Sequence, residues 1–479
     1  ISFQKIMSFK KIIEAHHPKN IALLGADNVC LTWGQIIKLL RSIEINLNFY
    51  EDGRIFQVGP DTSFENILAF TFACYSGVSI EIVETSASTE VENKLASLIG
   101  DICKNPEKSV QVNKFGKKQS VIDRCNQEII LETSGTTGSR KKIVHGIVSL
   151  EYQARMVSKK LDLSVDHRQL AYMPLNYVYG MSVILTWLQS GSSLAISRHL
   201  PQSLGKFFDE ILRTKVTLFS AVPHTYLLMN RWGFHNLSNS KIRCLTQAGG
   251  FLPKAVKNKL IKENPEIDLF VMYGQTEFCG RISMGLYREN TAPNFAGSIL
   301  EEVSAIVDEN GELFINSPSV CLNADKIMKQ LNHRGKLYYS TGDIGHVVGQ
   351  ELFVNGRNQN FIKVGGKRLP QKDIVFLIEK NEEINSVYLT NGIDRSEKVL
   401  IGIHIEPIDS EGNSYDELIS KLERPFKVEL KKLLGNTGYR IYILSGPLPT
   451  LANGKVDALQ ISEILKDTFV EKKPVHIRL

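Results

Sequence analysis

Short apolar runs alternate with longer segments of helical periodicity along most of the chain, and this alternation restricts the possible folds most strongly. The segments SFENILAFTFACYSG and LEYQARMVSKKL carry apolar residues at helical spacing, while the apolar runs are IALLG, GRIFQVG, SIEIV, QEIILET, SSLAIS and DLFVMYG. Strands that alternate with helices in this way are typical of α/β proteins, whose strands are largely buried. We therefore predict an α/β fold.

The pattern changes near residue 357. The stretch ELFVNGRNQNFIKVGGKRL predicts a twisted pair of strands, and strand and helix patterns on a smaller scale follow it. A chain of 479 residues is also too long for one ordinary hydrophobic core. We therefore predict two domains, residues 1–357 and the smaller segment 358–479.

One long segment of the chain, from Gln169 to Ser197, contains no charged residue, and its length would suffice to span a bilayer. Because Pro174, Asn176 and Gly180 interrupt it, we interpret it as a buried strand, loop and helix, without stable membrane insertion.

Composition excludes several classes of function. The net charge of +6 is small for this length, and basic runs interleaved with aromatic residues are missing, so we expect no nucleic-acid partner. Seven scattered cysteines form no CxxC pair, which predicts reduced thiols and a cytoplasmic protein without a structural zinc site. We assign no chemistry to His16, His17 or His145, which we expect on solvated faces or in satisfied polar sites.

The stretch ETSGTTGSRKK at residues 132–142 is a candidate phosphate-binding loop. Gly135 and Gly138 let the backbone turn its N–H groups inward, and Lys141 adds a positive charge. Its hydroxyl donors are Thr133, Ser134, Thr136 and Thr137. The Walker pattern GxxxxGK[ST] is absent, because Arg140 stands where its second glycine belongs. The loop alone is equally consistent with a nucleotide site and with a polar turn.

Taken with other motifs, the loop resembles the phosphate loop of the adenylate-forming superfamily, which includes acyl-CoA synthetases and peptide-synthetase adenylation domains. The other matching stretches follow in the family's order and are MYGQTE at 272–277, YYSTGDIG at 338–345, GRNQNFIKVGGKRL at 356–369 and LPTLANGKVD at 448–457. The resemblance covers essentially the whole chain. It implies a large N-terminal domain of α/β subdomains and a small, mobile α+β C-terminal domain.

The resemblance also implies ATP and Mg²⁺ as cofactors and assigns residues to them. Residues 133–138 and Lys141 would hold the β- and γ-phosphates. Tyr273, next to Gly274, would lie against the adenine ring, and Thr276 would donate to the α-phosphate. Glu277 would hold Mg²⁺, which prefers carboxylate oxygen.

Three further residues have implied roles toward the ribose and the reacting groups. Asp343 would accept hydrogen bonds from both ribose hydroxyls, assisted by Arg357. Lys455 would bridge the substrate carboxylate and the α-phosphate. Each has a plainer reading in isolation: Asp343 could shape a turn, Lys455 could be a solvated lysine, and Tyr273 could be a core aromatic. The order of the motifs favours the functional roles.

The sequence departs from the family pattern at several positions. Arg140 and Lys142 stand where Pro and Gly are usual, and both add positive charge beside the phosphates. Gln359 occupies the hinge position, where the family usually has Asp or Lys, so the balance between domain orientations is expected to differ. Leu451 replaces a common Thr but leaves Lys455 in place.

The largest departure from the family pattern is in the predicted substrate pocket. Tyr177, in MPLNYVYGMS, stands where peptide-synthetase domains place an Asp against the substrate's α-ammonium. A buried ammonium without a carboxylate would be costly, so we expect an acid without an α-amino group. The opposite wall is small and mostly apolar, with Gln247, Ala248 and Gly249.

These features predict an AMP-forming acid:thiol ligase, with catalytic residues Lys455, Thr276 and Glu277. Acyl-AMP and pyrophosphate would form first. The acyl group would then pass to CoA or to the phosphopantetheine of a separate carrier protein. The alternatives are a non-catalytic nucleotide- or acyl-binding family member and a phosphate-transferring kinase.

Overall fold

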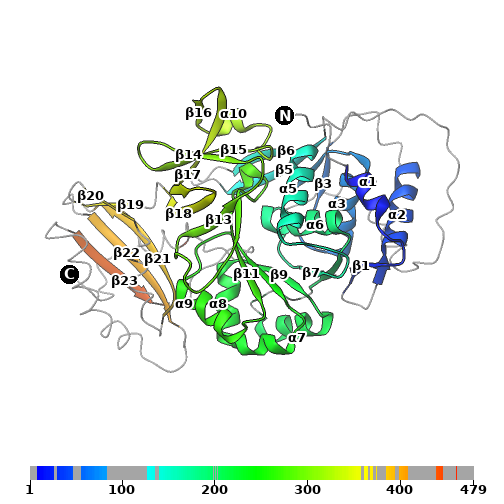
Figure 1. Ribbon diagram of the computed structural model, residues 1–479, viewed down its shortest axis with the longest axis horizontal. Coiled ribbons are helices and arrows are strands. Elements are labelled where there is room, and N and C mark those ends of the chain that lie inside the picture. The colour runs from blue at the N-terminus through cyan, green and yellow to red at the C-terminus, as the bar shows by residue number, and fades with distance from the viewer. Residues whose placement is uncertain are drawn as a thin grey trace.

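The computed structural model describes most of the chain up to Arg357 and selected segments beyond it (Figure 1). The described residues are 8–25, 30–46, 55–83, 127–134, 140–197, 199, 201, 203–357, 361–364, 367–370, 374, 384–393, 399–407, 439–445 and 460. The elements keep the labels of Figure 1.

A 14-stranded sheet forms the centre of the molecule, in the order β14-β15-β17-β18-β13-β12-β11-β10-β9-β7-β8-β1-β2, with β16 paired to β17. Its parallel half comprises β1 (Ile21–Leu24), β7 (Arg168–Ala171), β8 (Ser193–Ile196), β9 (Leu218–Ala221), β10 (Cys244–Gln247) and β11 (Asp268–Tyr273). The remaining strands pair antiparallel and are β2 (Cys30–Thr32), β12 (Ser283–Leu286), β13 (Phe295–Ile299), β14 (Ser304–Val307), β15 (Glu312–Asn316), β16 (Gln330–His333), β17 (Lys336–Val348) and β18 (Glu351–Arg357). The α/β prediction is confirmed.

A second sheet carries the candidate phosphate loop and consists of β3 (Phe56–Val58), β4 (Ile80–Ile82), β5 (Glu128–Ser134) and β6 (Arg140–Gly146). The first three strands are parallel, whereas β5 and β6 form an antiparallel hairpin. The sequence patterns predicted a helix soon after the loop and missed β6. The chain in fact forms a strand first and enters α5 only at Ile147.

The two segments predicted as helices from their periodicity form α3 and α5. The helices of the described residues are α1 (Phe9–Ala15), α2 (Trp33–Asn46), α3 (Phe64–Ser76), α5 (Ile147–Lys160), α6 (Val178–Ser190), α7 (Leu204–Thr214), α8 (Pro223–Trp232), α9 (Lys254–Glu263) and α10 (Ala324–Ile327), with 3₁₀ turns η4 (Phe234–Asn239) and η5 (Thr276–Phe278). In α3, Ser63 caps the N-terminus by accepting from the Asn66 N–H, and Gly77 ends the helix in the left-handed region.

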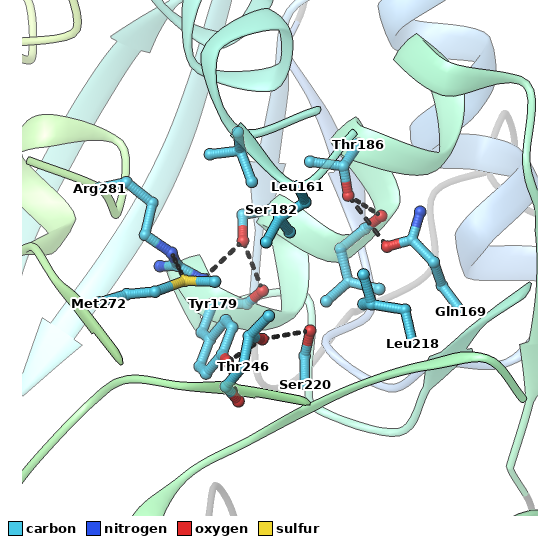
Figure 2. A pocket seen from close by; sticks show the side chains of 12 residues that line it. Leu161, Gln169, Tyr179, Ser182, Thr186, Leu218, Ser220, Thr246, Met272 and Arg281 are labelled. Atoms are coloured by element: carbon cyan, nitrogen blue, oxygen red, sulfur yellow. Dashed lines mark hydrogen bonds between the residues drawn. The ribbon is translucent and has the colours of Figure 1, made fainter. Parts of the chain in front are cut away.

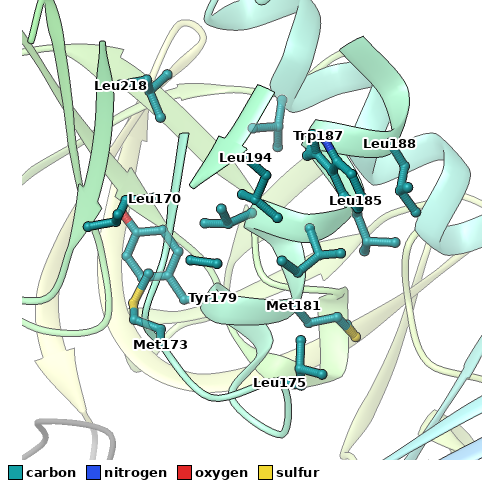
Figure 3. Close-up of a cluster of buried hydrophobic side chains, with 14 of the residues drawn as sticks. Leu170, Met173, Leu175, Tyr179, Met181, Leu185, Trp187, Leu188, Leu194 and Leu218 are labelled. Carbon is teal, nitrogen blue, oxygen red and sulfur yellow. The ribbon is translucent and has the colours of Figure 1, made fainter. Parts of the chain in front are cut away.

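The uncharged segment 169–197 folds as predicted into β7, a loop, α6 and β8 inside the main core (Figure 3). Residues of α6 from Val178 to Leu188 are buried. Trp187 anchors the helix by donating to the Ala22 carbonyl at 3.0 Å and by stacking on Trp33. Among the described residues, none of the helices combines the length and the apolar character that a membrane span requires.

The segments beyond Arg357 form their own sheets. β19 (Phe361–Val364) pairs with β20 (Lys367–Pro370), while β21 (Ile384–Ile393), β22 (Val399–Pro407) and β23 (Tyr439–Ser445) form a three-stranded sheet. The prediction of one strand pair across 351–369 was therefore wrong. The first half of this stretch, β18, belongs to the large sheet, where it lies between β17 and β13. Only the second half forms a local pair, β19 with β20.

Candidate active site

Asp343 is the centre of a buried polar cluster where two antiparallel strands meet. It lies on β17 directly opposite Arg357 of β18, and its exposure is 5%. One carboxylate oxygen, Oδ2, accepts from the Tyr273 hydroxyl at 2.6 Å and from the Gln275 amide at 2.7 Å. The other, Oδ1, lies 3.5 Å from Arg357 Nε. Since a carboxylate oxygen has two lone pairs, Asp343 retains acceptor capacity for a ligand.

Burial dominates the electrostatics of this cluster. It raises the pKa of the Asp343 carboxyl, while the charge of Arg357 and the hydrogen bonds from Tyr273 and Gln275 oppose that rise. Arg357 is largely exposed, so it gives only partial compensation. The structure thus keeps a carboxylate in a poorly solvated position, where an additional hydrogen-bond donor is favourable.

The segment after β11 reaches this cluster through Tyr273 and Gln275. Gln275 was not among the predicted site residues, yet its amide donates to both the Asp343 carboxylate and the Thr341 carbonyl at 2.7 Å. Its place inside the MYGQTE motif was the available signal. Tyr273 is held through its hydroxyl, so the orientation of its ring is fixed; its contact with adenine remains a prediction.

Thr276 and Glu277 form the single turn η5, which is anchored from two sides. The Glu277 carbonyl accepts from the Cys321 N–H at 2.8 Å. On β6, His145 Nδ1 lies 3.0 Å from the Cys279 sulfur. Burial lowers the pKa of His145 to about 4, so the ring is neutral near pH 7. The side chains of Thr276 and Glu277 are half-buried, which is compatible with ligand contact.

The predicted settings are found for His16 and His17 but not for His145, whose Nε2 is buried without a hydrogen-bond partner among the described residues. His145 is completely buried, in the polar site behind η5. His16 is half-buried, with Nε2 2.8 Å from the Leu188 carbonyl, and His17 is exposed.

The candidate phosphate loop connects the two strands of the β5–β6 hairpin, with Thr133 opposite Lys141 and Ser134 opposite Arg140. The loop therefore differs from a strand–loop–helix nucleotide site, and no helix N-terminus follows it directly. Lys142, expected to add charge near the phosphates, instead pairs with Glu81 at 2.5 Å. Residues 135–139, which include Gly135, Thr136, Thr137 and Gly138, lie outside the described residues, as do the side chains of Thr133 and Ser134.

Two predicted residues of the acid pocket come together at the start of α6. Tyr177 precedes α6 and is 8% exposed. Gly249 has φ of +88°, and a Cβ there would overlap the Tyr177 hydroxyl oxygen. Ala248 is buried beside it, whereas the Gln247 amide turns to the Gly250 carbonyl at 2.7 Å. The wall therefore depends on a residue without a side chain at position 249.

Behind this wall, tyrosines and hydroxyl groups share hydrogen bonds. The Thr246 carbonyl accepts from the hydroxyls of Tyr179 and Tyr226, at 2.8 Å and 2.9 Å. The Thr246 hydroxyl lies 2.7 Å from the Tyr179 hydroxyl and donates to Ser220 at 2.9 Å. These contacts connect α6 and α8 to strands β9 and β10.

Arg281 lies in the same region and was not identified from the sequence (Figure 2). Its exposure is 2%, and its guanidinium carbon lies 4.1 Å from the centre of the Tyr179 ring. It borders a cavity of about 10 Å³, which is room for about one water molecule. A charged residue within the mostly apolar run FCGRISMGL was the signal that could have found it.

Two other predicted residues cannot be placed. Lys455 and Gln359 lie outside the described residues, so their roles stay predictions. Among the described residues, no cluster of three or more His, Cys, Asp or Glu side chains could hold a metal. A single carboxylate at Glu277 fits Mg²⁺, because this ion is usually held by one or two carboxylates together with substrate phosphates.

Comparison with known proteins identifies related sequences and folds. A family model described as AMP-binding enzyme matches residues 80–322. An indoleacetate–CoA ligase of Aromatoleum aromaticum is 24% identical over 366 residues, covering 72% of this chain and 68% of that protein. A D-alanine–D-alanyl carrier protein ligase of Bacillus velezensis is 23% identical over 373 residues, covering 72% of each.

Solved structures show the same fold. An anthranilate CoA ligase in complex with anthranoyl-AMP superposes with a TM-score of 0.75 at 18% identity, covering 97% of this chain and 99% of that one. An o-succinylbenzoate CoA synthetase from Bacillus subtilis, in complex with ATP and magnesium, gives 0.69 at 16% identity and covers 95% and 98%.

Proposed function

Since the chain belongs to the AMP-binding enzyme family and is an ATP- and Mg²⁺-dependent, AMP-forming ligase, we propose that it joins a carboxylic acid without an α-amino group to a thiol through an acyl-adenylate. The observation that carries this proposal is the cluster of Asp343, Tyr273, Gln275 and Arg357. It offers a buried carboxylate to ribose hydroxyls beside an oriented aromatic ring. The motif residues Thr276 and Glu277 follow within one turn.

In the first step, an oxygen of the substrate carboxylate attacks the α-phosphorus of ATP, and the bond to pyrophosphate breaks. Negative charge accumulates on the α-phosphate oxygens, so donors and cations aimed there lower the barrier. We propose that the Thr276 hydroxyl donates to these oxygens and that Glu277 would hold Mg²⁺. When bound, the ion offsets phosphate charge. Lys455 would bring a further cation to the reacting carboxylate.

In the second step, the sulfur of a thiol attacks the acyl carbonyl, and the bond between the acyl carbon and AMP breaks. The thiol gives up its proton to solvent. The two relatives' names include both CoA and a carrier protein, and we propose one of these as the acceptor. Free cysteines among the described residues, Cys30, Cys74, Cys244, Cys279 and Cys321, are compatible with a cytoplasmic location, which we also propose.

The proposed acid preference rests on the wall of the pocket. Its predicted members Tyr177, Gln247, Ala248 and Gly249 include no carboxylate that would balance an α-ammonium. One relative acts, by its name, on D-alanine, so amino acids belong in the substrate screen. Acid-dependent exchange of labelled pyrophosphate into ATP, measured over a panel of acids with and without α-amino groups, tests this point. Exchange confined to amino acids would contradict it.

Lys455 provides the sharpest test of the two-step mechanism. We propose that residues 358–479 form a small domain that turns between the steps, carrying Lys455 away after adenylation. In Lys455→Ala, the rate of acyl-AMP formation should fall by about 10²–10³-fold, as for removal of one oxyanion-type donor. ATP affinity should stay close to the parent value.

The second half-reaction is the internal control. With preformed acyl-AMP and the accepting thiol, Lys455→Ala should form thioester at nearly the parent rate in single-turnover experiments. Equal losses in both half-reactions would contradict the turning domain. Absence of pyrophosphate exchange with every acid, despite ATP binding, would favour the alternative of a non-catalytic binding protein.

A further inference from the structure

Arg281 carries a buried positive charge that no carboxylate of the described residues balances. Its three nitrogens donate to the Gly280 carbonyl at 2.7 Å, the Ser182 hydroxyl at 3.1 Å and the Met272 sulfur at 3.0 Å. All three acceptors are uncharged, and a thioether accepts only weakly. A guanidinium has five N–H donors, so two of them have no partner within the described part of the chain.

Such an arrangement is unfavourable for the folded protein by itself. Burying a charge is costly unless a counter-charge and hydrogen bonds compensate, and a neutral side chain of similar size would fill the same space more easily. Stacking over Tyr179 recovers part of this cost. Arginine stays charged even when buried, so the site cannot escape the cost by losing a proton. A function for the charge is the simplest explanation.

Arg281 lies between the nucleotide motif and the predicted acid wall. The backbone of Gly280 and Arg281 packs so closely on Gly274 that a Cβ there would come within 2.8 Å of the Arg281 Cα. On its other side, the guanidinium contacts α6 through Ser182 and Tyr179. Burial raises the pKa of the Tyr177 hydroxyl, and the nearby charge of Arg281 opposes that rise. The cation is therefore next to the position where the acid is proposed to bind.

We propose that the acid activated by this enzyme carries a second anionic group, such as a second carboxylate, and that this group pairs with Arg281. This inference rests on the proposed function and specifies its substrate class. The guanidinium lies over the Tyr179 ring, and its planar fork of N–H donors matches the two oxygens of a carboxylate. The cavity of about 10 Å³ that Arg281 borders has room for about one water and is not the acid's own site.

Pyrophosphate exchange with matched acids tests the proposal on the wild-type enzyme. The pairs are butanoate and butanedioate, hexanoate and hexanedioate, and benzoate and isophthalate. In the accepted pair, kcat/KM for the diacid should exceed that for the monoacid by about 10- to 150-fold, the range expected for hydrogen bonds to charged groups. Preference for the monoacid in every accepted pair would overturn the proposal while leaving the ligase function intact.

Substitutions then test whether Arg281 causes the preference for the diacid. Arg281→Gln should lower the diacid-to-monoacid ratio by a similar factor. Arg155→Gln is the matched control, because Arg155 also lies over a tyrosine ring but pairs with Glu302 at the surface. It should leave the ratio unchanged. An equal loss for both acids in Arg281→Gln would contradict a role in recognising the second anion.

Thermal unfolding separates recognition from a purely structural role. Removal of Arg281 leaves no buried carboxylate of the described residues without its counter-charge. The Arg281→Met variant should therefore unfold at the same temperature as the parent or at a higher one. A marked decrease, together with an unchanged acid preference in the soluble variant, would assign Arg281 to the core. Failure of exchange with all acids, including the amino acids, would reject the proposed function and this inference together.

Discussion

The two ends of the candidate site balance charge in opposite ways. At the proposed nucleotide end, the protein itself gives the Asp343 carboxylate three partners, Tyr273, Gln275 and the cation Arg357. At the proposed acid end, the Arg281 cation has only neutral hydrogen-bond partners among the described residues. The first arrangement suits a neutral ribose, whose hydroxyls can join an existing network. The second suits a ligand that brings its own negative charge.

Gly274 joins the two ends, and its substitution should have the largest effect. A Cβ in Gly274→Ala would overlap the Gly280 carbonyl oxygen, so the backbone must move apart. Overpacking of this kind costs about 1–3 kcal/mol, and misplacement by 1 Å can reduce activity by about 10²-fold. We expect ATP affinity, measured by calorimetry, and acid preference, measured by pyrophosphate exchange, to fall together.

Gly205→Ala is the control, because its Cβ meets nothing within 4 Å on the exposed side of α7. It should leave both measurements unchanged and gain up to about 1 kcal/mol of stability. If Gly274→Ala alters only one end, the two ends are not coupled through this contact.

Asp343→Asn should weaken ATP binding by about 10- to 150-fold, because the ribose hydroxyls lose a charged acceptor. Stability should change in the opposite direction. Burial raises the pKa of Asp343, so its favourable contribution to folding exists at low pH and is lost as pH rises through the raised pKa. At pH 7 the variant should therefore unfold at a higher temperature than the parent, and this difference should shrink in acid. Unchanged ATP affinity would refute the ribose assignment.

Tyr177→Asp would make the acid end resemble the nucleotide end by giving Arg281 an internal carboxylate. We expect the preference for a diacid to fall by about 10-fold or more, since the second anion must now compete with Asp. Binding of the natural acid should also weaken. Tyr177→Phe should keep the preference. Full activity of Tyr177→Asp on the natural acid would show that residue 177 does not line the pocket.

Lys142→Ala should have the smallest effect, although its charge lies near the candidate phosphate loop. The ion pair with Glu81 is mostly exposed on the lysine side, and such pairs contribute at most about 1 kcal/mol. ATP affinity should change by less than about 5-fold. A larger loss in calorimetry would indicate that Lys142 leaves Glu81 to contact the nucleotide.

The sequence was sufficient to predict the strands whose apolar runs are continuous, such as β5 and β11. It was also sufficient to predict the helices α3 and α6. It failed at β6, because RKKIVHG begins with three cations and its strand character comes from pairing with β5. The split of 351–369 between two sheets was equally invisible, since pairing partners distant in sequence decide it. In the candidate site, motif order predicted Asp343 and Tyr273, and the structure brings them together, while their roles toward a nucleotide stay predictions. Gln275 and Arg281 required knowledge of burial and of neighbours across the fold.

The hydrogen bonds shared behind the acid wall have a consequence for how such a pocket changes during evolution. Tyr179 and Tyr226 both depend on one carbonyl, that of Thr246, and Tyr179 also supports Arg281. Loss of any one partner leaves a buried hydroxyl or cation without a hydrogen-bond partner. This is more destabilising than replacing the partners together. Inherited single substitutions here should therefore be selected against, and descendants with a new acid specificity should differ at several of these positions at once.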